Sequence, residues 1–203
     1  MKFEIWDVHT HLFGLPDSSP EGRLARLLEY AGRLGISRLC VMMGMTTHYD
    51  PTPDFLRESN DEVLRAIRHF PDRSFGFAYL NPKHTQASLD EINRCVRDGP
   101  MVGIKLWVAL RCNDPRLDPI AQRAAELKAP IVQHTWYKIT GNLPGESTPD
   151  DLAQLAARHP QTTFIAAHTG GDWERGIRAI RPHPNIYADI NGGDPTAGFT
   201  EMA

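Results

Sequence analysis

The 203-residue sequence predicts an α/β fold, a TIM-type (β/α)8 barrel in which about seven strands are present. Short apolar runs alternate with helical patterns at intervals of roughly 30 residues, which is typical of consecutive βαβ units. No Gly-x-Gly-x-x-Gly follows the first run, where a dinucleotide-binding sheet would normally carry one. Several runs end in histidine instead, and a barrel collects its catalytic groups at such ends. We therefore favour a barrel over an open sheet, as a single domain over residues 1–203.

The composition is that of an ordinary globular protein, with 41% hydrophobic and 23% charged residues. The formal net charge is −3 and basic residues are not clustered, so we expect no nucleic-acid partner. No apolar stretch approaches the roughly 20 residues of a membrane span, which predicts a cytoplasmic protein without a membrane partner. Cys40, Cys95 and Cys112 are odd in number and lack Cys-x-x-Cys spacing, so we expect reduced thiols.

The elements alternate in order from a first strand at Phe3–His11, which Gly14 and Pro16 end. A helix at Leu24–Leu34 stops at Gly35, where glycine commonly follows a helix. Pro51 and Pro53 predict a loop over residues 44–54. The remaining helices are expected at Asn60–Phe70, Ser88–Arg97, Pro115–Leu127, Pro149–Arg158 and Trp173–Ile180, and the remaining strands at Arg38–Met43, Phe75–Leu80, Val102–Leu106, Ile131–His134, Thr163–His168 and Ile186–Ile190.

Four of the nine histidines are expected at one mouth of the barrel. His9 and His11 are two residues apart on one strand and so share a face, while His134 and His168 end the fifth and sixth strands. Neutral imidazole is a good zinc ligand. A hydrogen-bonded polar residue at a strand end explains each histidine equally well when it is taken alone. Four at one mouth favour a metal centre.

These motifs resemble those of a known family. His-x-His on the first strand, Gly-Ile-Lys-Leu at Gly103–Leu106, His134, and His-Thr-Gly-Gly at His168–Gly171 resemble the amidohydrolase superfamily in their order. The likeness is greatest to its amidohydrolase-related branch, amidohydrolase family 2, whose members are TIM-barrel metal-dependent hydrolases, and it runs along essentially the whole chain. That branch contains hydrolases and also decarboxylases that use the same metal site.

The resemblance implies that His9, His11 and His134 bind one divalent ion, most simply Zn²⁺. His168 would be a further ligand or the catalytic residue that orients the attacking water or the substrate. Zinc lowers the pKa of a bound water to about 7, so the resulting hydroxide would attack an amide, ester or lactone carbonyl of a small molecule. Two other readings remain open, a metal-dependent non-oxidative decarboxylase and a metal-binding protein without turnover.

Substrate-binding residues are expected at the same mouth. Two hypotheses are open for Lys105. It is either a carboxylated lysine that bridges two metals, as in some relatives, or an ordinary ammonium. The ammonium would bind a substrate carboxylate or pair with a buried acid. Trp107, Trp136 and Tyr137 follow strands on the same face and predict an apolar pocket wall, although tryptophan also packs commonly in cores. The long loop Thr135–Thr148 is of the kind that carries specificity or acts as a lid. His48 and His84 are expected in loops at this face, where either would contact substrate or solvent.

The likeness ends at the eighth strand, where the family keeps an aspartate. The sequence stops after a Gly-Gly turn and a segment, Ala197–Ala203, that resembles the opening of a helix, so we expect a C-terminally truncated version of a longer chain. Asp189 on the seventh strand is a candidate catalytic replacement, although hydrogen bonding to neighbouring loops also explains an aspartate there. Seven strands leave two open edges, which predicts a homo-oligomer.

Overall fold

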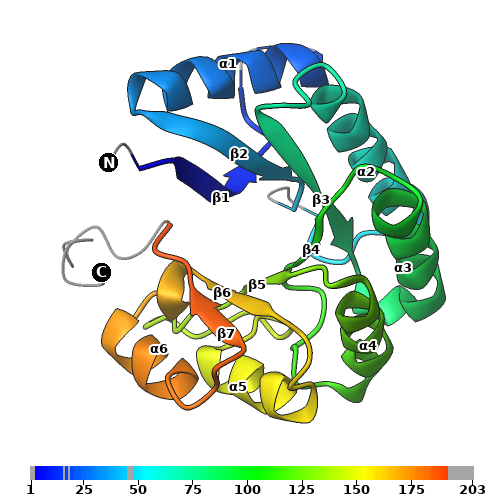
Figure 1. Ribbon diagram of the computed structural model, residues 1–203. Coiled ribbons are helices and arrows are strands. Elements are labelled where there is room, and N and C mark those ends of the chain that lie inside the picture. The colour runs from blue at the N-terminus through cyan, green and yellow to red at the C-terminus, as the bar shows by residue number, and fades with distance from the viewer. Residues whose placement is uncertain (1–2, 16, 18, 45–47, 192–203) are drawn as a thin grey trace.

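One parallel sheet curls into most of a barrel, with the helices on its outer face (Figure 1). The computed structural model describes residues 3–15, 17, 19–44 and 48–191. The strands follow one another around the sheet in chain order, and every neighbouring pair is parallel. They are β1 (Ile5–His11), β2 (Ile36–Met42), β3 (Ser74–Leu80), β4 (Gly103–Leu106), β5 (Ile131–His134), β6 (Phe164–Ala167) and β7 (Ile186–Ala188). The predicted α/β barrel with seven strands is confirmed.

Helices join the strands across the outer face of the sheet, as βαβ units require. They are α1 (Pro20–Arg33), α2 (Pro53–Ile67), α3 (Thr85–Ile92), α4 (Asp118–Leu127), α5 (Pro149–Arg158) and α6 (Trp173–Ile180). Shorter turns adjoin them at η1 (Pro82–His84), η2 (Asn93–Arg97), η3 (Pro115–Leu117) and η4 (His168–Gly170). None of the helices in the described ranges is long and apolar enough to cross a bilayer.

The predicted start of α2 was wrong. The helix begins at Pro53 rather than Asn60, because Thr52 caps it by accepting a hydrogen bond from the Phe55 amide. A proline is well tolerated in the first turn of a helix, where its missing N–H has no partner to lose. Asn60 lies inside the helix, fully buried, where its side chain pairs with the backbone N–H and C=O of Tyr79 on β3. The asparagine therefore ties α2 to the sheet instead of starting the helix.

Side-chain alternation along the strands separates two layers of packing. The larger layer lies between sheet and helices and includes Leu39, Val41, Ile104 and Ile131. A smaller cluster fills the inner face of the curl, formed by Cys40, Met42, Phe77, Val132 and Ala167. Lys105 and His134 stand at inward positions of their strands by the same alternation, so both reach the interior at the end where β4 and β5 finish.

The three cysteines are buried free thiols, as predicted. Burial raises the pKa of Cys40 to about 11 and the pKa values of Cys95 and Cys112 to about 12. All three therefore stay protonated near neutral pH and act as small core side chains.

The two end strands of the described sheet, β1 and β7, face each other across the opening of the curl (Figure 1). Side chains join them at one end. Asn191 donates to the backbone carbonyl of His9 at 2.6 Å, and His9 Nδ1 lies 2.6 Å from Asp189 Oδ2. His9 of β1 is thus held by two residues that follow β7.

Candidate metal centre

The structure brings the four predicted histidines together at the C-terminal ends of the strands. His9 Nε2 and His11 Nε2 are 3.1 Å apart at the end of β1. The ring centroid of His168 lies 5.0 Å from that of His9 and 5.0 Å from that of His134. Residues separated by up to 159 positions in the chain therefore line one pocket, because parallel strands finish at the same edge.

His168 reaches this pocket through a turn rather than along a strand. Strand β6 ends at Ala167, and η4 begins with His168 and Thr169 at φ values of +63° and +46°. Non-glycine residues rarely adopt this left-handed conformation, and where they do the surrounding structure holds them there. Here the Thr169 hydroxyl donates to the Asp189 carbonyl at 2.7 Å. The expected strand over Thr163–His168 is therefore one residue too long at its C-terminal end, and it also starts one residue early, since β6 begins at Phe164.

Three of the four histidines have an oxygen atom beside one ring nitrogen. His9 Nδ1 donates to Asp189 Oδ2 at 2.6 Å, and His134 Nε2 donates to Glu146 Oε1 at 2.9 Å. His168 Nδ1 donates to the backbone carbonyl of Asn191 at 2.6 Å. A neutral imidazole has a single N–H, so each of these bonds places the ring's lone pair on its other nitrogen. An oxygen acceptor behind the ring is the usual arrangement around metal-ligating histidines.

The histidines are uncharged at neutral pH, which is the form that binds metal. Burial, together with the nearby Lys105, lowers the pKa of His9 and of His11 to about 2. Burial and the neighbouring imidazoles lower the pKa of His168 to about 3, and burial also lowers the pKa of His134. Four neutral imidazoles at one pocket form a nitrogen donor set that suits zinc.

The spacing of one pair also fits a zinc ion. Two ligands at about 2.0–2.1 Å from a tetrahedral zinc lie about 3.3–3.4 Å apart. The Nε2 atoms of His9 and His11 are 3.1 Å apart, and His11 Nδ1 is buried without a hydrogen-bond partner among the described residues. Within the same residues, no three His, Cys, Asp or Glu side chains already stand as a closed set of ligands. The residue types therefore suit a zinc ion, and the His9–His11 pair has nearly the spacing of two ligands. A full ligand set requires a shift of the His134 or His168 side chain.

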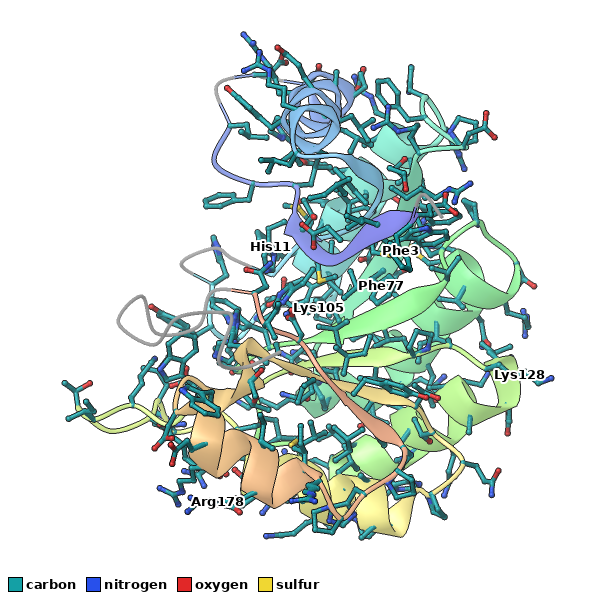
Figure 2. The ribbon with its side chains drawn as sticks, turned by 60° about the vertical axis from the view of Figure 1, so that its left-hand side comes forward. Phe3, His11, Phe77, Lys105, Lys128 and Arg178 are labelled. Atoms are coloured by element: carbon teal, nitrogen blue, oxygen red, sulfur yellow. The ribbon has the colours of Figure 1, made fainter. Side chains whose placement is uncertain are left out.

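Lys105 occupies the floor of the pocket. Figure 2 shows Lys105 in the interior of the curl. Its side chain is 1% exposed, and its Nζ lies 2.8 Å from His9 Nε2. Burial lowers the pKa of Lys105 to about 7, against the opposing attraction of Asp189. The sequence left open a direct ion pair between Lys105 and a buried acid. In the structure the amine bonds to the imidazole of His9 instead. The amine instead shares the lone pair of His9 that a metal ion would use.

A cavity of about 440 Å³ opens above the histidines. Trp107 and Trp136 line it, as expected. Tyr137 was wrongly expected on this wall: its hydroxyl donates to Asp150 at 2.8 Å and its ring stacks under Arg175. Tyr49 completes the wall instead, with its ring centroid 5.4 Å from that of Trp107. The cavity is thus an apolar, flat-walled space with imidazoles and an amine at its base.

Two loop histidines lie apart from this cavity. His48 stacks on Phe55 with ring centroids 4.4 Å apart, and His84 belongs to the short turn η1. Neither lines the pocket. His69 and His159 follow the ends of α2 and α5, where His69 bonds to the Arg65 carbonyl and His159 to Asp118.

Glu146 is a buried residue of the site that the sequence analysis missed. It is 1% exposed, lines the cavity, and bonds His134, Lys138 and the backbone amide of Leu143. Burial by itself would raise the pKa of Glu146, but the hydrogen bonds from His134 and Lys138 outweigh it and lower the pKa to about 2. One signal was present in the sequence, because Glu146 is the single carboxylate in the loop Thr135–Thr148.

Comparison with known proteins agrees with this architecture. The family model described as amidohydrolase matches residues 6–201. The chain belongs to the amidohydrolase family. Members of this family are metal-dependent enzymes, which include decarboxylases, hydratases and hydrolases. The resemblance inferred from the histidine and glycine motifs is thereby confirmed.

Two solved structures of similar fold are decarboxylases. The 2,6-dihydroxybenzoate decarboxylase from Rhizobium superposes with a TM-score of 0.69 at 17% identity, over 93% of this chain and 80% of the other. The 5-carboxyvanillate decarboxylase from Sphingomonas paucimobilis gives 0.67 at 12% identity, over 93% and 81%. At these identities the likeness establishes the fold.

A curated relative matches over a shorter stretch. The chain is 26% identical over 107 residues to the 2-amino-3-carboxymuconate-6-semialdehyde decarboxylase of Dictyostelium discoideum. The match covers 51% of this chain and 30% of that protein, so it spans less than a third of the relative's length.

Proposed function

We propose that this member of the amidohydrolase family is a zinc-dependent, non-oxidative decarboxylase of a small, flat carboxylic acid. The observation that carries the proposal is the buried amine of Lys105 beside the four imidazoles, at the base of a cavity walled by tryptophan and tyrosine. An amine in such a place suits a carboxylate, and flat aromatic walls suit a conjugated or aromatic substrate body. Decarboxylases recur among the similar proteins, which supports this choice over hydrolysis.

Each residue has a role in this proposal. His9, His11 and His134 hold the divalent ion, with His168 as a further ligand or as the group that positions the substrate. When bound, the ion fixes the substrate carboxylate and draws negative charge from it. Lys105 binds the same carboxylate, and Trp107 and Trp136 hold the substrate ring.

Asp189 orients one of the histidines, and the bond changes of the reaction balance without a further reactant. Asp189 accepts a hydrogen bond from the Nδ1–H of His9 and keeps Nε2 directed to the imidazole of His11. The bond between the carboxylate carbon and the adjacent substrate carbon breaks, its electron pair stays on that adjacent carbon, and that carbon takes one proton from solvent. Carbon dioxide leaves, and no water is consumed.

Hydrolysis of an amide, ester or lactone is the second candidate. A neutral imidazole set that holds zinc also lowers the pKa of a bound water to about 7, and the fold supports water chemistry in a relative. The 4-oxalomesaconate hydratase from Rhodopseudomonas palustris superposes with a TM-score of 0.66 at 16% identity, over 92% of this chain and 73% of the other.

One assay separates the candidates. Zinc-loaded protein is incubated with a panel of hydroxybenzoates and unsaturated dicarboxylic acids, and separately with aryl esters and lactones. We expect carbon dioxide release from at least one acid, which the His9→Ala/His11→Ala variant fails to release. Ester or lactone cleavage without carbon dioxide would establish the hydrolase instead. Zinc binding with neither reaction would indicate a binding protein without turnover on these compounds.

A further inference from the structure

We propose that Glu146 is a positioning residue that fixes the ring proton of His134 on Nε2 and so reserves Nδ1 for the metal ion. The claim that Nδ1 binds a metal ion rests on the proposed function. The claim that the proton lies on Nε2 does not, because it follows from hydrogen bonds within the protein alone.

The carboxylate of Glu146 is surrounded by donors. Oxygen Oε1 lies 2.9 Å from His134 Nε2, while Oε2 lies 2.8 Å from Lys138 Nζ and 3.0 Å from the backbone N–H of Leu143. The side chain is 1% exposed, so water does not compete for these bonds. An ionised carboxylate can only accept hydrogen bonds, and Lys138 and the Leu143 amide can only donate them. His134 Nε2 must therefore carry its proton to pair with Oε1.

The position of the proton on Nε2 also determines the state of Nδ1. A neutral imidazole with its proton on Nε2 has its lone pair on Nδ1. Nε2 is turned toward Glu146, whereas the ring lies 5.0 Å from that of His168 within the histidine group. If the proton moved to Nδ1, the lone pair would be directed at the carboxylate, and His134 would present an N–H where a metal requires an electron pair.

The same carboxylate connects the pocket wall to the metal centre. Lys138, Leu143 and Glu146 all line the cavity, and they belong to the loop that leaves β5 directly after His134. Folding of this loop around Glu146 is therefore what brings a carboxylate to His134. The loop Thr135–Thr148, which we expected to carry specificity, therefore also sets the protonation of His134.

Replacing Glu146 with glutamine gives a sharp test because the two side chains have the same shape. Two of the three donors bond to Oε2, so the amide oxygen of glutamine will face Lys138 and Leu143, and its NH₂ group will face His134. An NH₂ group donates, which requires a bare Nε2 on His134 and moves the ring proton to Nδ1. We expect the zinc affinity of Glu146→Gln to fall about 10–100-fold, the usual effect of losing an oxygen partner behind a ligand.

The experiment measures the proton and the metal separately. Nitrogen-15 NMR of the histidine rings in metal-free protein at pH 7.5 reports which nitrogen of His134 is protonated, with the signal assigned by a His134→Gln variant. We expect protonated Nε2 in the wild type and protonated Nδ1 in Glu146→Gln. Zinc affinity is then measured by competition with a chromophoric chelator, and circular dichroism checks the fold.

Lys138→Met is the matched control. It removes a donor from the same carboxylate but leaves the bond to His134, so its His134 should keep the proton on Nε2. A wild-type His134 protonated on Nδ1 overturns the proposal even if Glu146→Gln does not fold. So does a Glu146→Gln protein with an unchanged tautomer and unchanged zinc affinity. Failure of the proposed function looks different, since the wild type would show protonated Nε2 on His134 and bind no zinc.

Discussion

At the scale of single residues, the imidazole pair on β1 is the part of the site with its donors already at ligand spacing. His9 and His11 face each other through Nε2 atoms 3.1 Å apart. We predict that the His9→Ala/His11→Ala variant loses zinc, because two donors of the set disappear together. Elemental analysis of untagged protein measures it. His69→Ala is the control, since His69 bonds a helix carbonyl away from the pocket and should leave the zinc content unchanged. A double variant that retains zinc would remove the metal centre from β1.

Lys105 competes with a metal ion for the lone pair of His9 Nε2. Its amine lies 2.8 Å from His9 Nε2 and carries a positive charge below its pKa of about 7. We predict that Lys105→Met binds zinc at least about tenfold more tightly at pH 6.5, a gain of about 1.4 kcal/mol. The advantage should shrink at pH 8.5, where the wild-type amine is neutral.

Competitive chelator titrations at the two pH values test the role of Lys105. Weaker zinc binding by the methionine variant would contradict the prediction. It would favour the alternative in which the lysine itself contributes to holding metal, as a carboxylated lysine does.

At the scale of elements, a close approach between α6 and η4 holds His168 in place. A Cβ added to Gly176 of α6 would lie 1.9 Å from the Thr169 carbonyl oxygen, so no side chain fits there. We predict that Gly176→Ala destabilises the protein by about 1–3 kcal/mol through overpacking, and shifts the ring signals of His168. Gly32→Ala in α1 is the matched control, because no atom lies within 4 Å of its added Cβ. That change should stabilise by about 0.5–1 kcal/mol. Urea denaturation measures both, and equal effects would contradict the proposed contact.

Elements whose signals are local could be predicted from the sequence. Ile131–His134, Pro149–Arg158 and Trp173–Ile180 have the bounds that we expected, because apolar spacing and flanking breakers define them within a few residues. The start of α2 was misplaced because Pro53 is compatible with both a loop and a first helical turn. Only the Thr52 cap, a matter of geometry, decides between them.

The histidines of the site were predictable and their partners were not. A histidine at the end of a parallel strand is placed by the topology alone, so spacing sufficed for His9, His11, His134 and, nearly, His168. Glu146 reaches His134 only through the path of a loop, which sequence periodicity does not describe. The same holds for Tyr49 and Tyr137, since loop conformation decides which ring faces the cavity.

At the scale of the whole molecule, burial of four neutral imidazoles makes stability depend on pH. Their pKa values lie below the value of about 6.5 in an unfolded chain. As the pH falls below 6.5, the unfolded chain binds protons that the native protein does not, so the free energy of unfolding falls. The expected slope is about 1.4 kcal/mol per pH unit for each histidine that stays neutral. Asp189, whose pKa burial raises, reduces the net slope.

Urea denaturation of chelator-treated protein at pH 7.5, 6.0 and 5.0 tests this dependence. The His9→Ala/His11→Ala variant serves as the comparison, because it lacks two of the four groups and should show a shallower decline. Equal stability of the wild type at all three values would mean that the imidazoles are not held neutral by the fold.

The edges of the sheet give the last prediction. In the described part of the chain, β1 and β7 each have one side without a strand partner, and the bonds of His9 to Asp189 and Asn191 join them at one end only. Apolar side chains stay exposed along these strands, with Ile5 49% and Tyr187 62% exposed. Unpaired edges with apolar side chains recruit other strands. We therefore predict that the chain self-associates, with edge strands of two copies in contact.

Sedimentation velocity at about 50 μM tests the association, a concentration at which edge-to-edge contacts become populated. Ile5→Lys and Tyr187→Lys should shift the protein toward monomer, because a lysine at a strand edge opposes pairing. Ile139→Lys is the control, since this fully exposed residue lies in the loop after β5, away from both edges. Loss of association in the control would locate the contact at that loop. A monomeric wild type would mean that the two edges satisfy each other within one molecule, and that the side-chain bonds at His9 suffice to hold the curl closed.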